Sequence, residues 1–396
     1  MTARPACVML VAAEASGDAL GAGLARALRR RLGDKVRFVG VGGALMAKEG
    51  VDSPFDIAEL SVLGLFEGLA AYGRVVRRAD ETAALAARER PDVAVLIDSW
   101  GFTLRVAKRL RRLNPKLPLV KYVAPQVWAS RPGRAKTLAG AVDHLLSINA
   151  FDAPYFEREG LPVTFVGNSA LAKDFSAADP RRLRDHIGAG PDDPILLVLP
   201  GSRPAEIARV MPPFEDAVNL LKADRPKLQV VVPAASTVVD AVRARVAGWP
   251  HRAHVIEDDG LKLDAMKAAT LALACSGTVT TELALAGCPM VVGYRIGDLT
   301  HAVLKHLIRT PYITLFNITA QAFVAPELVQ SECTGPKLAA ELARRLDDPA
   351  LREAQVAAQF AALDKMGRGG PDPAEAAAAA VIAVLDRQAA GRTLEA

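Results

Sequence analysis

The chain has 396 residues and a mass of 41.9 kDa, which is too long for one ordinary hydrophobic core and suits two domains of similar size. Hydrophobic residues make up 51% of the chain, aromatic residues only 5%, and the net charge is +5, a composition that favours an α/β enzyme scaffold over a fibrous or disordered chain. The four cysteines form no C-x-x-C pair, which argues against a disulfide framework or a structural metal.

The first half of the chain alternates between short apolar runs and amphipathic stretches. Such alternation predicts a parallel, doubly wound sheet covered by helices. We expect strands at 8–12, 36–41, 93–97, 118–123, 145–148 and 163–166, with helices at 20–32 and 103–112.

A second alternating series follows a polar stretch at 177–194. Its expected strands lie at 195–199, 228–232, 254–256, 271–274 and 290–294. Near the end, Asp372 and Pro373 are suited to the N-cap and first position of a helix over 374–385. The sequence therefore predicts two Rossmann-like domains facing a cleft, at 1–180 and 190–370. The C-terminal helix and tail, 371–396, are expected to pack back toward the first domain.

In the first domain, acidic and small residues follow two of the expected strands. Glu14 and Ser16 follow the first strand, and Asp98 follows the strand at 93–97. Because ligands bind at the carboxyl edge of parallel sheets, these side chains are candidates for catalysis or substrate contact. The structural alternative for the first motif is a tight strand-to-helix turn, with Asp18 in the first turn of the helix. The structural alternative for Asp98 is a carboxylate that merely caps the following turn.

A basic segment occupies residues 101–150, with ten Lys/Arg and one acid. Within it, Trp128 is suited to stacking on a sugar and Arg131 and Arg134 to binding phosphate, although Trp128 is equally suited to filling the core. The segment lacks the aromatic interleaving of single-strand binders, so we expect a phosphorylated small molecule or lipid headgroup and no nucleic acid.

The second domain contains two strand-to-helix turns rich in small and hydroxyl residues. In both turns, backbone N–H groups and a helix dipole are expected to converge on a diphosphate. No Walker lysine or D-x-D motif accompanies them, which predicts a nucleotide-sugar site without an obligatory metal or other cofactor. The candidate residues are Gly201, Ser202, Arg203, Glu206, Ser276, Gly277, Thr278 and Glu282.

Together these motifs resemble the lipid-A-disaccharide synthase family of inverting GT-B glycosyltransferases over essentially the whole chain. The resemblance is carried by E-A-S-G-D at 14–18, F-V-G-V-G-G at 38–43, L-P-G-S-R at 199–203, S-G-T at 276–278 and C-P-M-V-V-G-Y-R at 288–295. Two further segments, 312–317 and 326–330, are similar to the family's late donor-side loop.

The resemblance implies a donor, UDP-2,3-diacylglucosamine, an acceptor, 2,3-diacylglucosamine 1-phosphate, and a β(1→6) product with release of UDP. It implies Asp98 as general base, with Glu14 as the next carboxylate, and Asn317 among the sugar-site residues. It also implies a cytoplasmic protein bound peripherally to the inner membrane through the apolar segment 60–73, which is otherwise suited to a buried helix. Whether the protein is a homodimer is left open.

Several residues depart from the family pattern around the candidate site. Gly101 and Thr103 replace a usual Asp and Asn, and Asn168 replaces a usual His. These changes affect sugar or acyl-chain preference more than reaction type. The alternatives are an enzyme similar to UDP-N-acetylglucosamine 2-epimerase and a non-catalytic protein that binds anionic surfaces.

Overall fold

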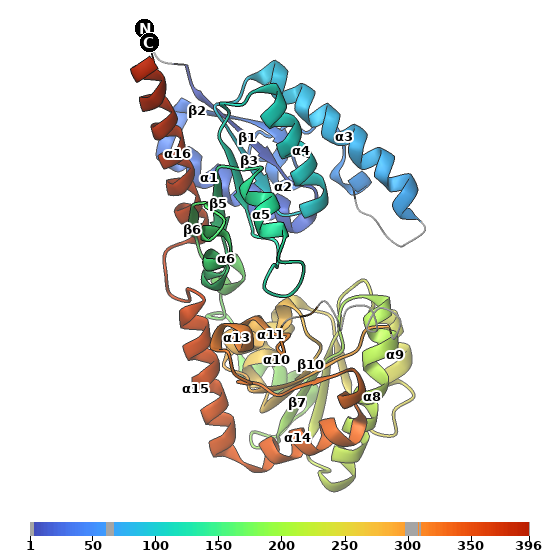
Figure 1. The fold of residues 1–396 in the computed structure, drawn as a ribbon. Helices are drawn as coiled ribbons and strands as arrows, with labels where there is room; N and C mark the ends of the chain where they lie inside the picture. The colour runs from blue at the N-terminus through green and yellow to red at the C-terminus, as the bar shows by residue number, and fades with distance from the viewer. Residues whose placement is uncertain (1–3, 61–66, 298–307, 309, 396) are drawn as a thin grey trace. The chain divides into compact units, whose positions relative to one another are not determined.

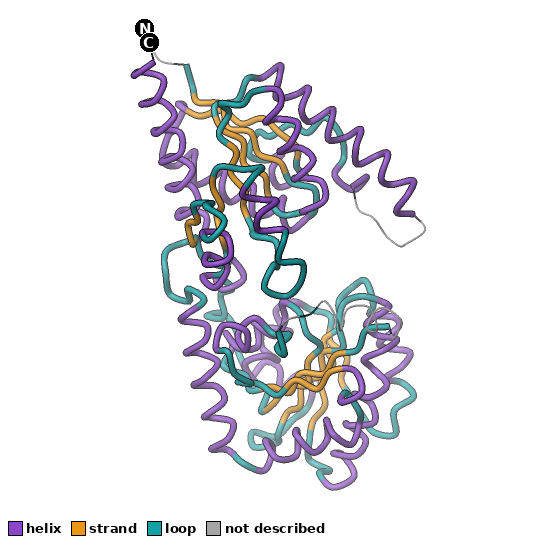
Figure 2. Tube along the Cα trace, viewed as in Figure 1, coloured by secondary structure: helices purple, strands orange, loops and turns teal. Residues whose placement is uncertain are grey.

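The computed structural model describes residues 4–60, 67–297, 308 and 310–395. It divides into two compact units, one made of Met1–Ser169 with Gly370–Ala396 and the other of Ala170–Gly369. In each unit a central layer of strands is covered by helices (Figure 2). The sequence-based division differs in two respects: residues 170–180 belong to the second unit, and the C-terminal helix is part of the first.

The sheet of unit 1 has six parallel strands in the order β2-β1-β3-β4-β5-β6. The chain runs from β1 to β2 on one side and later to β3 on the other, so the strand order reverses between β1 and β3. The doubly wound sheet expected from the sequence is therefore confirmed. Its strands are β1 (Ala6–Val11), β2 (Val36–Val41), β3 (Val93–Ile97), β4 (Leu119–Tyr122), β5 (His144–Ser147) and β6 (Val163–Phe165).

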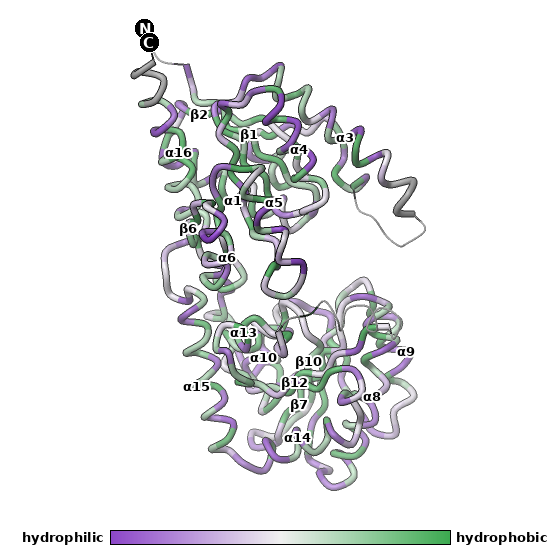
Figure 3. Tube along the Cα trace, in the orientation of Figure 1, coloured by the Kyte–Doolittle hydropathy of each residue, from purple (hydrophilic) through white to green (hydrophobic). Residues whose placement is uncertain are grey.

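Helices cover both faces of this sheet because side chains alternate between the two faces along each strand. Met9 and Val11 lie in the core formed with α3, α4 and α5, while Val8 and Leu10 lie in the core formed with α1 and α16. Apolar colour follows the strands in Figure 3. The helices are α1 (Ala15–Leu32), α2 (Ala44–Ala47), α3 (Glu67–Glu89), α4 (Trp100–Leu113), α5 (Arg134–Ala139), α6 (Ala153–Glu157) and α16 (Pro373–Glu395).

The C-terminal helix α16 lies alongside α1 (Figure 1). Asp372 accepts a hydrogen bond from the backbone N–H of Ala374, 2.8 Å from Oδ1, as its predicted role as the helix cap requires. Arg30 and Arg31 both pair with Glu375, at 2.5 and 2.7 Å. The helix thus completes the core of unit 1, as the fold prediction expected.

Unit 2 also has a six-stranded parallel sheet, with the order β12-β11-β10-β7-β8-β9, and its strand order reverses between β7 and β10. Its strands are β7 (Ile195–Leu199), β8 (Gln229–Pro233), β9 (His254–Ile256), β10 (Leu271–Ala274), β11 (Met290–Tyr294) and β12 (Glu327–Val329). Helices α8, α9 and α14 cover one face, and α7, α10, α11 and α15 cover the other. The helices are α7 (Pro180–Ile187), α8 (Pro204–Asp224), α9 (Val239–Val246), α10 (Asp259–Ala268), α11 (Thr278–Ala286), α13 (Leu315–Ala320), α14 (Gly335–Asp347) and α15 (Pro349–Lys365).

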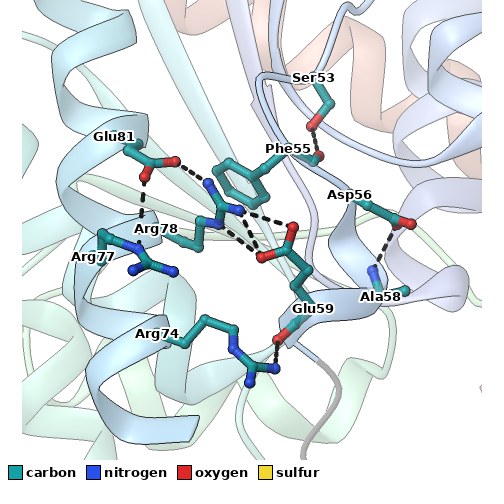
Figure 4. Close-up of polar contacts among 9 residues, drawn as sticks. All are labelled: Ser53, Phe55, Asp56, Ala58, Glu59, Arg74, Arg77, Arg78 and Glu81. Carbon is teal, nitrogen blue, oxygen red and sulfur yellow. Dashed lines mark hydrogen bonds and ion pairs between the residues drawn. The ribbon is translucent and has the colours of Figure 1, made fainter.

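The apolar segment 60–73 is described only in part, since residues 61–66 lie outside the described ranges. At its start, Leu60 is buried in the core of unit 1, and at its end Tyr72 is 57% exposed. The short helix η2 (Ile57–Leu60) leads into the segment. Arg78 of α3, which follows the segment, holds η2 by pairing with Glu59 at 2.6 Å and stacking over Phe55 (Figure 4). Across the described ranges, none of the helices combines the length and apolarity that crossing a membrane requires.

Candidate functional site

The carboxyl ends of β1 and β3 flank the point in unit 1 where the strand order reverses. In open α/β sheets this is where ligands bind, because the chain leaves the two strands in opposite directions and opens a crevice. Glu14 and Ser16 follow β1 and are exposed, and Asp98 follows β3 and is partly exposed. The structure therefore brings the three predicted residues to one edge of one sheet.

Asp98 sits in a strained turn. Its φ is 47° and that of Ser99 is 37°, so two successive non-glycine residues adopt the left-handed conformation. The backbone N–H of Asp98 donates to the carbonyl of Tyr122 at 2.9 Å, which keeps the turn attached to β4. The Asp98 carboxylate forms no hydrogen bond or ion pair with any described residue. Strain of this kind together with an unused carboxylate is typical of a functional position.

Asp18 has a structural role instead. It is 5% exposed, and its carboxylate accepts hydrogen bonds from the backbone N–H groups of Gly43, Leu45 and Met46 at 2.8, 2.9 and 3.0 Å. These are the first N–H groups around helix α2, which lack partners within the helix. Of the acidic residues in this motif, only Glu14 thus remains open to solvent.

The loop after β4 carries Trp128, Arg131 and Arg134, the residues predicted to contact a sugar and a phosphate. Trp128 is partly buried, and its ring packs edge to face against that of Phe151 with centroids 5.5 Å apart. Part of the side chain therefore fills space below the loop and part remains open to solvent. Arg131 is exposed, and the guanidinium of Arg134 stacks over the ring of Trp100 at 5.0 Å. Burial and the neighbouring charge of Arg131 lower the pKa of Arg134. Two cations therefore lie close together without an acidic partner among the described residues.

Two other cations of the basic segment form ion pairs with acidic residues. Arg109 pairs with Asp80 at 2.6 Å, and Arg111 pairs with Asp143 at 2.7 Å. The α4 cations at these two positions therefore serve the fold. Arg131 and Arg134 are the members of the segment that the structure places at the carboxyl edge of the sheet without such an acid.

Beneath the Trp128 loop lies a buried polar cluster at the end of β5. Ser147 Oγ donates to Asp152 Oδ2 at 2.7 Å, and the Asn149 amide donates to the same oxygen at 3.3 Å. Asp152 is 1% exposed, and burial raises its pKa to about 6 against the opposing effect of these hydrogen bonds. The nearby indole N–H of Trp128 also lowers the pKa of Asp152, although its geometry falls short of a hydrogen bond to the carboxylate.

In unit 2, a pocket of about 370 Å³ opens where the strand order reverses between β7 and β10. Both predicted turns line it. Sequence reasoning missed five lining residues, Pro233, Ala234, Ala235, Lys262 and Met266. They lie at and just after the end of β8 and within α10, where no local motif marks them, and only the folded sheet brings them to the turns.

The first of these turns differs from the prediction. The backbone N–H groups of Ser202 and Arg203 donate to Glu206 Oε2 at 2.9 and 3.2 Å, and the Arg203 guanidinium pairs with Oε1 at 3.0 Å. Glu206 thus occupies the donors that were expected to bind a diphosphate, as part of a capping box at the start of α8. Gly201, with φ of 118°, lets the chain pass over this carboxylate.

The second turn keeps its donors open. The backbone N–H groups of Gly277, Thr278 and Val279, at the start of α11, have no acceptor among the described residues. Ser276 Oγ donates to the carbonyl of Ile313 at 3.3 Å, which orients the hydroxyl at the pocket wall. Glu282, one turn inside α11, pairs with Lys173 at 3.0 Å. Of the two turns, this one therefore has the more open backbone donors.

Asn317, which was expected at the sugar site, is not among the residues that line this pocket. The side chain is fully buried, its amide nitrogen donates to the carbonyl of Ala325 at 2.9 Å, and its oxygen accepts from the N–H of Ala325 at 3.1 Å. Both polar atoms are thus used to fix the chain before β12, where the carboxylate of Glu327 holds Thr314.

Comparison with protein families matches residues 8–381 to the family described as lipid-A-disaccharide synthetase. The lipid-A-disaccharide synthase of Rhodospirillum centenum is 41% identical over 385 residues, which cover 97% of this chain and 96% of the relative. That of Ruegeria pomeroyi is 41% identical over 384 residues, covering 95% and 94%. The match extends through both units and includes all the motifs that suggested the family.

Solved structures share the fold at much lower identity. A UDP-GlcNAc 2-epimerase from Neisseria meningitidis bound to UDP-GlcNAc aligns with a TM-score of 0.57 and 10% identity, covering 97% of this chain and 100% of the other. MurG of Acinetobacter baumannii aligns with a TM-score of 0.54 and 18% identity, covering 90% and 95%. The epimerase and binding-protein alternatives are not favoured. The chain belongs to the lipid-A-disaccharide synthase family of glycosyltransferases.

Proposed function

We propose that the protein transfers 2,3-diacylglucosamine from UDP to 2,3-diacylglucosamine 1-phosphate, forming a β(1→6) bond with inversion and releasing UDP. The observation that carries the proposal is the pair of complementary chemical groups found where the strand order reverses in each sheet. One has an unpaired carboxylate, Asp98, and the other a pocket with open backbone N–H donors at Gly277, Thr278 and Val279. An inverting transfer needs a base and a site that stabilises the departing diphosphate.

For the donor, the start of α11 is proposed to hold the diphosphate. Its open N–H groups and the hydroxyls of Ser276 and Thr278 are donors to phosphate oxygens, and the helix dipole favours negative charge there. A pocket of about 370 Å³ is within the size range of small-molecule sites. Glu282 is suited to accept hydrogen bonds from ribose hydroxyls. Arg203 is 77% exposed and can turn from Glu206 toward a bound phosphate.

For the acceptor, Arg131 and Arg134 are proposed to bind the 1-phosphate. Two neighbouring cations without an acid bind a phosphate through charge-assisted hydrogen bonds. Trp128 offers part of its ring to the sugar, and Ser16 and Glu14 contact sugar hydroxyls. Asp98 takes the proton from the attacking hydroxyl, since its carboxylate is partly exposed and has no other partner among the described residues.

The proposal includes peripheral association with the cytoplasmic face of the inner membrane. Both substrates carry acyl chains, so they remain in the lipid phase. The apolar composition of residues 60–73, the exposed Tyr72 near the end of this segment and the cations of the Trp128 loop support the proposed membrane association.

The experiment is an assay of UDP release from UDP-2,3-diacylglucosamine in the presence and absence of the lipid acceptor. We expect UDP release that requires the acceptor and a disaccharide 1-phosphate of matching mass. A parallel incubation with UDP-N-acetylglucosamine, analysed for 2-epimerisation, is expected to show no conversion. Epimerisation, or UDP release without a disaccharide product, would contradict the proposal.

A further inference from the structure

Lys121 is a buried cation in the middle of the unit 1 sheet. It belongs to β4 and is 3% exposed. Its ammonium group donates to the backbone carbonyl of Asp98 and, at 2.9 Å, to the hydroxyl of Thr103. Neither partner is an anion, so within the described part of the chain the lysine has no ion pair.

Burying an ammonium group without an ion pair destabilises the folded state. Burial lowers the pKa of Lys121 to about 7, although the charges of Asp98 and Glu14 act in the opposite direction. An apolar side chain of similar length would avoid the cost of burying a charge. A purely structural explanation therefore accounts poorly for a lysine at this position.

The contacts of Lys121 converge on the strained turn. The carbonyl of Asp98 accepts from both Lys121 Nζ and Thr103 Oγ1, the latter at 2.8 Å. The carbonyl of Ser99 accepts from the backbone N–H of Thr103 at 3.0 Å and also lies 2.9 Å from Oγ1. These bonds fix the left-handed backbone at both residues, which would otherwise relax toward a more populated conformation.

We propose that Lys121 is a positioning residue for the transfer reaction: through the Asp98 carbonyl it holds the turn, and with it the carboxylate, in the orientation that meets the acceptor hydroxyl. This inference rests on the proposed role of Asp98 as base. The two acidic groups that face the ammonium are Asp98 on the turn after β3 and Glu14 at the start of α1. Its position therefore links both carboxylates of the candidate catalytic edge.

The first test is the variant Lys121→Met, with exposed Lys35→Met as the matched control. We expect kcat to fall about 10- to 100-fold, because misplacing a reacting group by about 1 Å has effects of this size. UDP affinity in unit 2 and acceptor KM should stay within a few-fold of wild type. Since the wild-type cation is disfavoured by burial, thermal stability at pH 6 should not fall. Unchanged kcat, or kcat and stability falling together, would overturn the proposal.

The second test needs no turnover and does not depend on the Lys121→Met variant. NMR with labelled lysine should show Lys121 titrating near pH 7 in the wild type. In Asp98→Asn its titration should move to lower pH, because a negative charge that favours the ammonium has been removed. Identical titration in both proteins would refute the coupling. Failure of the proposed function would instead appear as wild-type protein that releases no UDP while the coupling persists.

Discussion

Lys173 lies 3.0 Å from Glu282, so the acidic side chain assigned to the ribose has its own counter-charge in unit 2. Without that lysine, Glu282 would stand as an unpaired anion near the proposed diphosphate position and repel it. The lysine side chain is 38% exposed, so solvent and salt weaken its effect.

We therefore predict that Lys173→Met raises the Kd for UDP by a modest factor, roughly 3- to 10-fold, and more at low ionic strength than at high. Glu282→Gln in the same chain should recover part of this loss, because it removes the uncompensated charge. Isothermal titration calorimetry on the two single variants and the double variant measures the coupling. Additive effects at both salt concentrations would show that the pair does not act on UDP.

A second prediction concerns the turn over Glu206. In Gly201→Ala the added Cβ would lie 2.6 Å from Glu206 Oε2 and 2.7 Å from Glu206 Cβ, on a backbone with φ of 118°. We expect a loss of about 1 to 3 kcal/mol in unfolding free energy and weaker UDP binding, because the capping box must shift. Gly248→Ala is the control, since its Cβ has only Arg245 within 4 Å, at 3.5 Å from the carbonyl. Equal melting temperatures for both variants would contradict the prediction.

The sequence predicted the strands well because buried parallel strands are continuous apolar runs. Expected and observed bounds coincide for β2, β3, β7, β9, β10 and β11. The short β12 was not predicted as a strand, because its three residues begin with Glu327, whose carboxylate bonds across to Thr314. Helix α1 begins five residues before the expected start at Leu20, within the motif itself.

The sequence indicates which turns carry the candidate site residues, but not which side chains those residues contact. A strand-to-helix turn can be predicted from local sequence, and the structure does place Asp98 directly after β3 and Gly277 directly before α11. Which side chain fills a turn depends on contacts such as that between Lys121 and Asp98, 23 residues apart in sequence. For the same reason, local reasoning gave the N–H groups of Ser202 and Arg203 to a ligand, whereas Glu206 accepts both.

A third prediction uses the buried carboxyl group of Asp152. Its pKa is about 6 in the folded protein and near 3.8 in an unfolded chain, so the folded state retains a proton that the unfolded state loses. The contribution of the Asp152 carboxyl group to the unfolding free energy is therefore fully present below about pH 4 and is lost as the pH rises through 6. The loss amounts to roughly 3 kcal/mol at pH 8.

Asp152→Asn should remove this decline, since its amide stays neutral and its oxygen can still accept from Ser147. Denaturant unfolding at pH 5 and pH 8 is the measurement: the variant should gain stability relative to wild type at pH 8 and change less at pH 5. A difference between the two proteins that is independent of pH would count against the assignment.

The fourth prediction is that residues 60–73 contribute to membrane association. Polar substitutions at Leu63, Leu65 and Phe66, which lie outside the described residues, should lower binding to anionic lipid vesicles and turnover on membrane-embedded acceptor. UDP affinity should not change. Leu113→Ser, at an exposed leucine of α4, is the control. High salt or detergent should release the wild-type protein from membranes. Full activity and binding after the substitutions would show that the segment has another role.

The last prediction concerns Asp98 as general base. Asp98→Asn keeps the size of the side chain and the strained turn, but an amide cannot accept the proton of the acceptor hydroxyl. Loss of a general base typically lowers the rate by about 10² to 10⁴, so kcat should fall by that order. The Kd for UDP should remain near wild type, because the proposed donor residues belong to unit 2. Asp34→Asn, at an exposed position of unit 1, should leave the rate unchanged. Turnover by Asp98→Asn within a few-fold of wild type would rule out the assignment, and a large loss in Glu14→Gln would then identify Glu14 as the base.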